Sequence, residues 1–230
     1  MKKIIILTFW GLFALFTQAQ PICGTTGLLN IPSAEMQQDG TFMAGANFLP
    51  DKMTSTVFDY NTGNYFINLT FLPFMEFSYR MTLLKVITGK FNQDRSFGLR
   101  LRLLRERTYL PAFVIGGNDI FSTSGQEATY FNFIYGVVTK NLKLGESTLG
   151  LTTGFAHEGW GGLKDGNMKG IFGGVSFSPG ILPPLRLMAE FDSHAYNIGS
   201  SMLLFKHFFL YGMLHDMKNP AGGFAVFIFL

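Results

Sequence analysis

Apolar and polar residues alternate along the chain in short stretches that begin at Thr41 and continue to the last residue. Twelve such stretches can be marked. A strand with lipid on one side and a barrel lumen on the other alternates with period two. Because a bilayer excludes open sheet edges, strands of this kind must close on themselves. The pattern therefore predicts an all-β fold, a transmembrane antiparallel up-and-down β-barrel over residues 41–230.

The gaps between the stretches alternate between long and short, as expected for a barrel with outer loops and periplasmic turns. The predicted strands are 41–49, 62–72, 74–82, 95–104, 109–117, 128–139, 147–157, 168–178, 184–192, 195–205, 207–214 and 221–230. Ten or fourteen strands are the alternatives to twelve. With both termini in the periplasm, the odd-numbered connections become the outer loops. Ser193-His194 is too short for this rule, so either that hairpin is short or a strand limit near it is wrong.

Polar and charged residues fix which face of four predicted strands points inward. The inward positions are Asn64, Asn68, Thr70, Glu76, Ser78, Arg80, Ser96, Gly98, Arg100, Arg102, Arg186, Glu190 and Asp192. A slip of one residue would place arginines in lipid, at roughly 2–4 kcal/mol each near the midplane. The assignment is therefore strongly determined in these strands.

A soluble sandwich or a lipocalin-like barrel would also alternate. Two features favour the membrane barrel. The polar face carries glycine and other small residues, as a crowded lumen requires; among them are Gly150, Thr152, Gly154, Gly174 and Ser176. The chain also ends in the aromatic-rich run Phe224–Leu230, which resembles the terminal signal read by outer-membrane assembly machinery, although that signal usually ends on an aromatic residue.

The first residues have the pattern of a cleaved secretory signal peptide, residues 1–19. Lys2 and Lys3 precede an apolar run, Ile4–Phe16, and cleavage is expected before Gln20. A membrane helix is the alternative, but an apolar run of roughly 13 residues is shorter than the ~20 needed to span a bilayer. The signal peptide is the favoured interpretation.

Composition supports a membrane barrel and changes the apparent charge. Aromatic residues make up 16% of the chain and charged residues only 14%, against about 25% in soluble domains. Without Lys2 and Lys3, the 18 basic residues become 16 against 15 acidic ones, a balance of +1. No nucleic-acid partner is expected. Cys23, the single cysteine, is read as an ordinary residue of the N-terminal segment, with lipidation as the alternative.

Residues 20–40 precede the barrel and carry a motif. Its residues are Gly27, Leu28, Ile31, Pro32, Ser33, Asp39 and Gly40. This string resembles the N-terminal signature of the YjbH family of outer-membrane proteins associated with exopolysaccharide production. Leu185–Asp192 with Asn197-Ile198-Gly199, and the turn Leu72–Glu76, resemble further elements of that family. The resemblance covers residues 24–230 and implies a role in exporting or handling polysaccharide at the outer membrane.

Two interpretations of the inward charges stay open. Glu76, Arg80, Arg100, Arg102, Arg186, Glu190 and Asp192 could form a lumenal array that binds a polar polymer. Opposite charges inside a narrow barrel also pair simply to avoid isolated buried charge, and this structural role is favoured. Trp160 could stack on a sugar ring, although an interfacial aromatic anchor is the more common role.

No catalytic or metal-binding pattern stands out. None of the histidines, 157, 194, 207 and 215, lies in a serine elbow, and their spacing fits no metal site. We therefore expect no enzyme activity, no cofactor and no bound metal. The leading hypothesis is a non-enzymatic barrel in exopolysaccharide export or surface organisation. A small diffusion porin and an outer-membrane lipid or glycan hydrolase are the alternatives. Expected partners are outer-membrane lipid, the barrel assembly machinery, and polysaccharide or envelope-complex proteins.

The apolar residues of the N-terminal segment suggest that it is more than a tether. Leu28, Leu29 and Ile31 would be costly to leave in water, at roughly 1.5–3 kcal/mol for each side chain. A periplasmic strap could be removed with little effect, whereas a lumen plug or a partner-docking element could not. The sequence favours the plug or docking element.

Overall fold

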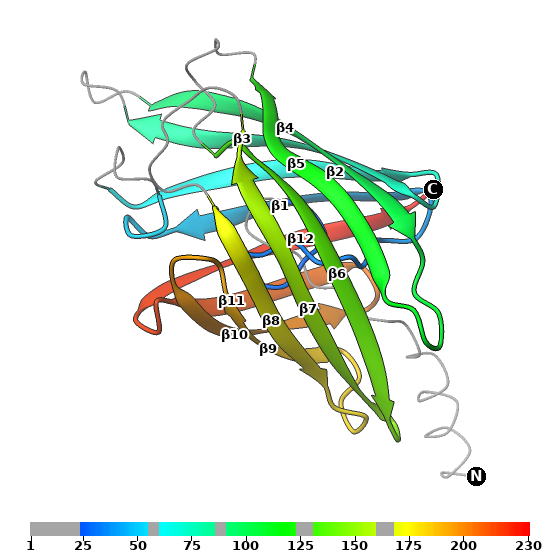
Figure 1. The fold of residues 1–230 in the computed structure, drawn as a ribbon. Helices are drawn as coiled ribbons and strands as arrows, with labels where there is room; N and C mark the ends of the chain where they lie inside the picture. Colours follow the sequence, from blue (N-terminus) through cyan, green and yellow to red (C-terminus); the bar gives the residue numbers. More distant parts are fainter. Residues whose placement is uncertain (1–23, 55–59, 86–90, 123–130, 160–167) are drawn as a thin grey trace.

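The computed structural model describes residues 24–54, 60–85, 91–122, 131–159 and 168–230. In these residues the chain forms a closed antiparallel barrel of twelve strands in sequence order, with β12 pairing with β1 (Figure 1). The strands are β1 Thr41–Leu49, β2 Thr62–Phe71, β3 Met75–Lys85, β4 Phe91–Leu104, β5 Ala112–Ser122, β6 Phe133–Leu144, β7 Ser147–Glu158, β8 Gly170–Ser178, β9 Leu185–Phe191, β10 Tyr196–Leu204, β11 Phe208–His215 and β12 Asn219–Phe229. The predicted fold class and strand count are confirmed.

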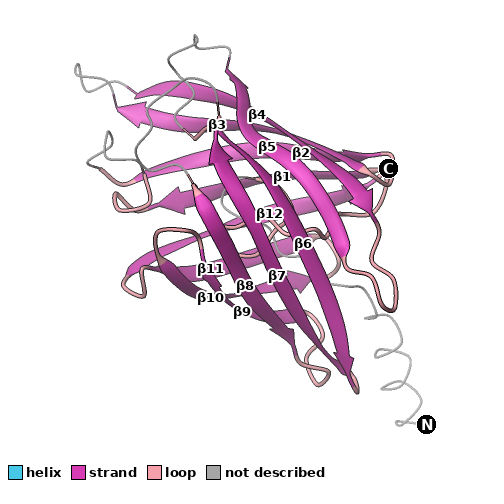
Figure 2. Cartoon of the chain, viewed as in Figure 1, coloured by secondary structure: helices cyan, strands magenta, loops and turns pink. Residues whose placement is uncertain are grey.

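Strands make up all of the regular structure that is described (Figure 2). No helix among the described residues is long and apolar enough to cross a membrane.

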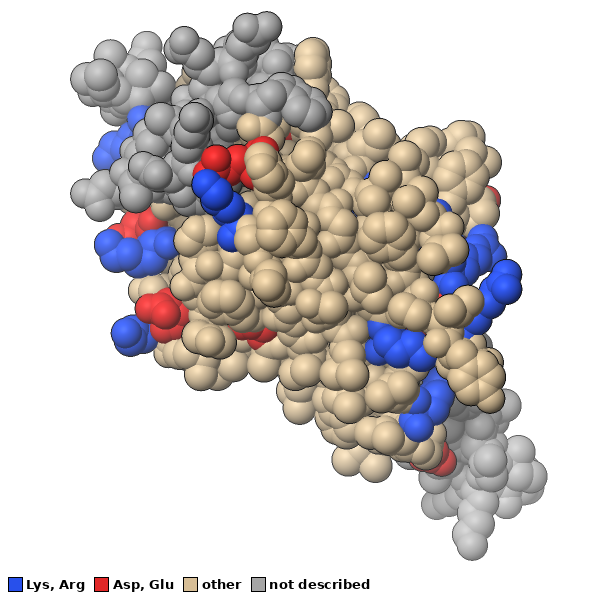
Figure 3. Space-filling model, viewed as in Figure 1, with Lys and Arg blue, Asp and Glu red and all other residues tan. Residues whose placement is uncertain are grey.

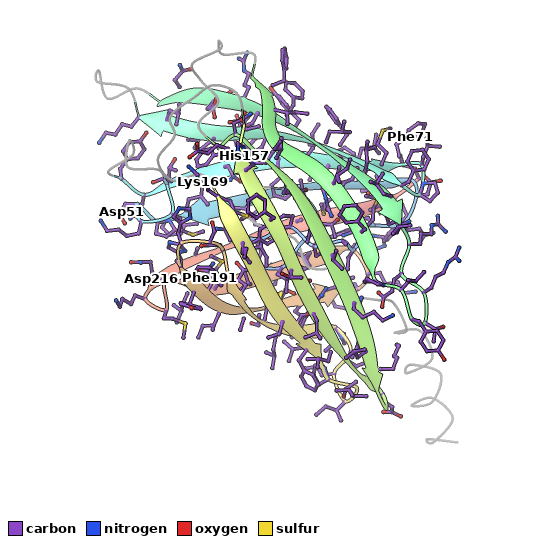
Figure 4. The ribbon with its side chains drawn as sticks, in the orientation of Figure 1. Asp51, Phe71, His157, Lys169, Phe191 and Asp216 are labelled. Atoms are coloured by element: carbon purple, nitrogen blue, oxygen red, sulfur yellow. The ribbon has the colours of Figure 1, made fainter. Side chains whose placement is uncertain are left out.

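The two ends of the barrel differ in their connections. Gly40 and Leu230 lie at the end with the shorter turns, where their backbones hydrogen-bond at 2.9 Å; we call this the turn end. The opposite loop end carries the connections after odd-numbered strands, and Asp51, Lys169 and Asp216 lie there, far from Phe71 at the turn end (Figure 4). The odd-numbered connections therefore share one end, as the sequence predicts.

Burial follows the predicted alternation in the four strands whose faces were assigned. Glu76, Ser78 and Arg80 are buried in the lumen, while Phe77 points outward and is 43% exposed. Large apolar side chains line the outer surface, and Phe97 contacts Phe77, Tyr79 and Phe121 there, with ring centroids 4.7–5.8 Å apart. An exterior of this kind suits lipid, because it would be unfavourable in water. The barrel thus fits an outer-membrane location.

The predicted limits of four strands are wrong by several residues. β5 and β6 start later than predicted and run further, to Ser122 and Leu144. In β5 a register shift between Phe97 and Leu99 of the partner strand interrupts the period-two pattern. β3 and β4 also extend toward the loop end, to Lys85 and from Phe91. Two consecutive leucines in β3 and the polar run Asn92–Asp94 in β4 hide the alternation there.

The short hairpin after β9 is genuine. The main-chain N–H of Asp192 donates to the Ala195 carbonyl at 3.1 Å. The Asp192 carboxylate also accepts the main-chain N–H of His194 and of Ala195, at 3.1 and 2.8 Å. An aspartate that bonds its own following backbone closes a tight turn. The hairpin is therefore short, and two separate strands, β9 and β10, flank it as predicted.

Candidate functional site

Residues 24–37 lie inside the barrel, and residues 38–40 lead into β1; we call residues 24–40 the plug. Leu29, Ile31 and Ala34 have no exposed surface. Gly27 and Pro32 form a β-bridge, so the segment between them folds back as a short hairpin. Gly24 has φ +79° and lies so close to Phe66 that a Cβ would come within 2.8 Å of its ring. The plug thus fills part of the lumen with its apolar residues, which accounts for the buried residues of the motif.

One wall of the lumen, formed by β3 and β4, holds the plug by an ion pair. Glu76 accepts hydrogen bonds from the main-chain N–H and the hydroxyl of Thr26, both at 2.7 Å. Arg100 Nη1 lies 3.1 Å from the Glu76 carboxylate, and both side chains have no exposed surface. Arg100 also donates to the carbonyls of Thr26 (2.6 Å), Glu35 (3.0 Å) and Ser33. The main chain of the plug therefore supplies hydrogen bonds to both members of the buried ion pair.

The opposite wall holds the tip of the plug. Glu190 of β9 accepts the main-chain N–H groups of Leu29 and Asn30 at 2.9 and 2.7 Å. The amide of Asn30 donates to Asp192 at 2.8 Å. Asn197 of β10 donates to both carboxylates, at 3.0 and 2.9 Å. Two wall acids thus replace the water that these plug amides would otherwise bind.

Glu35 is the charge that the plug itself contributes. Arg186 of β9 binds it through two nitrogens, at 2.8 and 3.1 Å, a bidentate arrangement that is stronger than a single hydrogen bond. Asn141 of β6 donates to the same carboxylate at 3.3 Å. The adjacent Ala34 N–H donates to Thr139 Oγ1 at 2.8 Å. The plug is therefore anchored to β6 and β9 as well as to β3 and β4.

Five of the seven predicted array residues contact the plug or its immediate neighbours, and two do not. The five are Glu76, Arg100, Arg186, Glu190 and Asp192. Arg80 lies nearer the loop end, with Nη2 3.2 Å from Ser96 Oγ and its guanidinium 4.8 Å from the Phe131 ring centroid. Arg102 is half-buried at the turn end and donates to the Pro73 carbonyl. Five residues of the array therefore hold the plug, while Arg80 lies toward the loop end and Arg102 lies toward the turn end.

The residues of the N-terminal motif divide into buried and more exposed ones. Gly27, Leu28, Ile31, Pro32 and Ser33 are buried in the plug. Asp39 is exposed, and Gly40, with φ +75°, leads into β1. The predicted sugar contact Trp160 lies outside the described residues.

The loop-end half of the lumen contains buried oxygens that lack hydrogen-bond partners. Among them are Thr82 Oγ1, both carboxylate oxygens of Asp94, and Asp119 Oδ1, on residues no more than 1% exposed. The other carboxylate oxygen of Asp119 accepts the main-chain N–H of Phe131 at 3.0 Å. Thr82 faces Asp94 across β3 and β4. Asp94 shares the inward face of β4 with Arg100, so the alternation could have identified it. Asp119 lies in the β5 bulge with φ +51°, where alternation fails.

The histidine rings contact nearby polar groups. His157 and His207 lie 2.6 and 2.9 Å from main-chain carbonyls, and His215 Nδ1 lies 2.9 Å from Asn197 Oδ1. His194 Nδ1 lies 3.0 Å from Ser193 Oγ, but Asp192 binds the main chain of His194 and not its ring. This arrangement differs from a serine–histidine–acid triad. Among the described residues no group of three or more candidate ligands could hold a metal ion.

Comparisons with known proteins address the family. No curated protein matches the chain. The crystal structure of the Salmonella typhi outer membrane phospholipase (OMPLA) dimer with bound calcium is similar at 12% sequence identity, with a TM-score of 0.41, over 84% of this chain and 91% of that one. The sequence model of the family described as "Exopolysaccharide biosynthesis protein YbjH" matches residues 20–202, which include the plug and β1 to β9. The chain therefore belongs to the YjbH family of exopolysaccharide biosynthesis proteins.

Proposed function

We propose that this protein is a non-enzymatic outer-membrane barrel that acts in exopolysaccharide export or cell-surface organisation, and that the plug closes its lumen until it is displaced. The observation that carries the proposal is the plug itself, held from opposite walls by Glu76 and Glu190. We infer further that a cleaved signal peptide and the barrel assembly machinery deliver the chain to the outer membrane.

The chemistry of the plug contacts supports a polysaccharide ligand. The wall carboxylates accept hydrogen bonds from main-chain N–H groups, and Arg100 donates to main-chain carbonyls. Hydroxyl groups both donate and accept hydrogen bonds, so a sugar chain can make bonds of both kinds. A polymer that enters the lumen could thus replace the plug without leaving these buried charges unpaired, which would be strongly unfavourable.

The loop-end half of the lumen adds to this argument. Thr82, Asp94 and Asp119 present buried oxygens that accept no hydrogen bond from the protein. Unsatisfied buried acceptors are costly, and water or sugar hydroxyls would satisfy them. We infer that a polar polymer would find acceptors along the lumen beyond the plug.

Two other functions make different predictions. A small diffusion porin would conduct ions steadily in a planar bilayer with its plug in place. A lipid or glycan hydrolase would lose activity when one histidine is replaced by alanine. For this alternative, His194 is the most informative position because its ring contacts Ser193.

The test is genetic complementation. Deletion of the gene is expected to reduce or disorganise surface polysaccharide, and the wild-type gene is expected to restore it. A variant lacking residues 27–38 should assemble as a heat-modifiable barrel and fail to restore the phenotype. Normal polysaccharide in the null strain would contradict the proposed function. Full complementation by the deletion variant would show that the plug is only a tether.

A further inference from the structure

The seam between β8 and β9 is the shortest contact between neighbouring strands among those that the structure describes. It has five residue pairs, from Gly173 opposite Phe191 to Phe177 opposite Leu187, whereas the other neighbouring strands share seven to twelve pairs. The shortest strand, β9, has seven residues and lies between β8 and β10 (Figure 1). Because paired residues supply the backbone hydrogen bonds of a sheet, fewer bonds must break to separate β8 from β9 than to separate any other two of these strands.

The pairing of β8 with β9 stops short of both ends of the seam. At the loop end, Gly170 to Phe172 of β8 pair with β7 but with no residue of β9. At the turn end, β9 pairs with β10 from Leu185 onward but with β8 only from Leu187. A separation at this seam would therefore leave β9 attached to β10.

The outer surface of the seam forms an apolar groove. Figure 3 shows the face that carries β6 to β8, where charged side chains gather at the two ends and the band between them is almost entirely uncharged. Two adjoining hollows of about 630 and 520 Å³ are both lined by Val175, Ala189 and Ile198. Gly173 and Gly174 also line the smaller hollow, where they add no side chain. Lipid surrounds this face of a membrane barrel, so an acyl chain is the occupant that the groove fits.

The inner side of the same seam binds the plug through polar groups. Glu190 follows Ala189 in β9 and accepts the main-chain N–H groups of Leu29 and Asn30. The backbone of β8 is close to it, since a Cβ at Gly174 would come within 2.8 Å of Glu190 Cβ. Lipid-facing and plug-binding residues are therefore neighbours in one strand.

Arg186 connects the plug to both strands of the seam. It lies in β9, binds Glu35 of the plug at 2.8 and 3.1 Å, and donates to Ser176 Oγ of β8 at 2.7 Å. The bond to Ser176 crosses the seam, and Glu35 holds the guanidinium in position for it. Displacement of the plug would remove Glu35 and so weaken the seam that has the fewest backbone bonds.

We propose that the β8–β9 seam is a lateral portal, which opens when the plug is displaced and takes an amphiphile with its acyl chain in the groove and its polar head group in the lumen. The proposal names a class of ligand and rests on the proposed function in one respect, the displacement of the plug. Hydroxyl groups of a sugar head group can both donate and accept hydrogen bonds, so they can replace the plug at Glu190 and Arg186. The acyl chain would stay in the bilayer throughout.

Hydrogen–deuterium exchange of the full-length protein in lipid nanodiscs tests whether the seam opens. Arg186→Met removes the bond to Glu35 and the bond across the seam. The amides of residues 173–177 and 187–191 should then exchange about tenfold faster than in wild-type protein, as expected for the loss of a hydrogen bond to a charged group. Exchange in β6 and β7, which share twelve pairs, should not change.

Arg102→Met is the matched control, because Arg102 is a wall arginine that donates to Pro73 and not to the plug. It should leave exchange at the β8–β9 seam as in wild-type protein. Unchanged exchange at the seam in Arg186→Met would overturn the portal, as would an equal increase in β6 and β7.

Photolabelling tests the ligand class. Two probes are added at equal concentration to the variant lacking residues 27–38: dodecyl maltoside with a diazirine on its sugar, and maltose with the same diazirine. Met188 faces the lumen opposite Ser176 and is the residue whose labelling is measured. The amphiphile should label it about tenfold more than maltose, because its tail concentrates it in the bilayer beside the portal.

Disulfide locks show which seam the amphiphile uses. In a Cys23→Ser background, Val175→Cys/Ala189→Cys places two cysteines opposite each other on β8 and β9. Oxidation should abolish the preference for the amphiphile, and reduction should restore it. The matched lock Val138→Cys/Thr153→Cys joins β6 to β7 and should have no effect.

Two labelling results would overturn the proposal. Equal labelling by the two probes would show that head groups reach the lumen from its ends, and labelling that survives the β8–β9 lock would exclude this seam. Heat-modifiable migration checks that each variant is folded, and Arg186→Met in the full-length chain replaces the deletion variant if that variant fails the check. Normal surface polysaccharide in a null strain would remove the export role, whereas exchange and labelling would still decide the portal.

Discussion

Two parts of the lumen differ in how their buried charges are satisfied. The plugged half comprises the wall residues that bind residues 24–40, including Glu190 near the loop end of β9, and the loop-end half comprises Thr82, Asp94 and Asp119 of β3, β4 and β5. In the plugged half, Glu76, Arg100 and Glu190 bind the backbone of residues 24–40 as well as each other or nearby amides. In the loop-end half, Asp94 is equally buried, yet neither of its carboxylate oxygens accepts a hydrogen bond. The inward charges of the plugged half therefore bind residues 24–40. The carboxylate of Asp94 in the loop-end half has no hydrogen-bond partner.

This difference bears on the two interpretations of the inward charges. Pairing within the wall explains only part of the plugged half, because Arg100 donates to three carbonyls of the plug besides its contact with Glu76. The wall instead resembles a peptide-binding surface whose bound peptide, residues 24–40, belongs to the same chain. Under the proposed function, a polymer that competes for the same groups would displace the plug.

The largest effect is expected at the centre of the plugged half. Arg100→Leu leaves Glu76 buried without its cation and should destabilise the folded barrel by about 3–5 kcal/mol. This change is measured by unfolding the barrel in guanidinium and monitoring the fraction that keeps heat-modifiable migration. The double variant Glu76→Gln/Arg100→Leu should recover part of the loss, and a fully additive double variant would argue against coupling.

Substitution of the neighbouring residue, Leu99, tests membrane insertion separately from binding of the plug. Leu99 lies next to Arg100 and faces lipid, so Leu99→Arg should cost about 2–4 kcal/mol and reduce insertion into liposomes. Leu99→Phe is the control, since it keeps the position apolar. Normal insertion of the arginine variant would contradict the inward and outward assignment.

The second wall should show a smaller effect. Arg186→Met removes the bidentate contact to Glu35, and we expect a loss of about 1.5–3 kcal/mol, typical of hydrogen bonds to charged groups. Proteolysis should then cut the plug faster while the barrel stays intact. The charge exchange Glu35→Arg/Arg186→Glu should restore protection, and unchanged cleavage in Arg186→Met would show that this wall does not retain the plug.

The smallest effect is expected in the loop-end half. Asp94→Asn removes a buried charge that has no hydrogen bond to lose, so stability should change by less than about 1 kcal/mol or rise. Glu76→Gln is the matched substitution in the plugged half and should be clearly destabilising. Equal effects in the same denaturant titration would remove the distinction between the halves.

The sequence predicted the barrel because lipid imposes a strict period of two on each strand. The same rule identified inward residues such as Arg100 and Glu190, which are buried in the lumen. It failed at Asp119, where a bulge interrupts the alternation, and it placed the ends of β5 and β6 wrongly. The contacts of Glu35 had no signal, because the plug has no repeat and its partners Asn141 and Arg186 lie more than a hundred residues away.

Ion conductance tests most directly whether the plug closes the lumen. Purified wild-type protein and the variant lacking residues 27–38 are compared in planar bilayers at equal numbers of inserted barrels. We predict little steady conductance for wild-type protein and stable open channels for the deletion variant. Equal conductance of the two proteins would contradict the claim that residues 24–40 are the closing element.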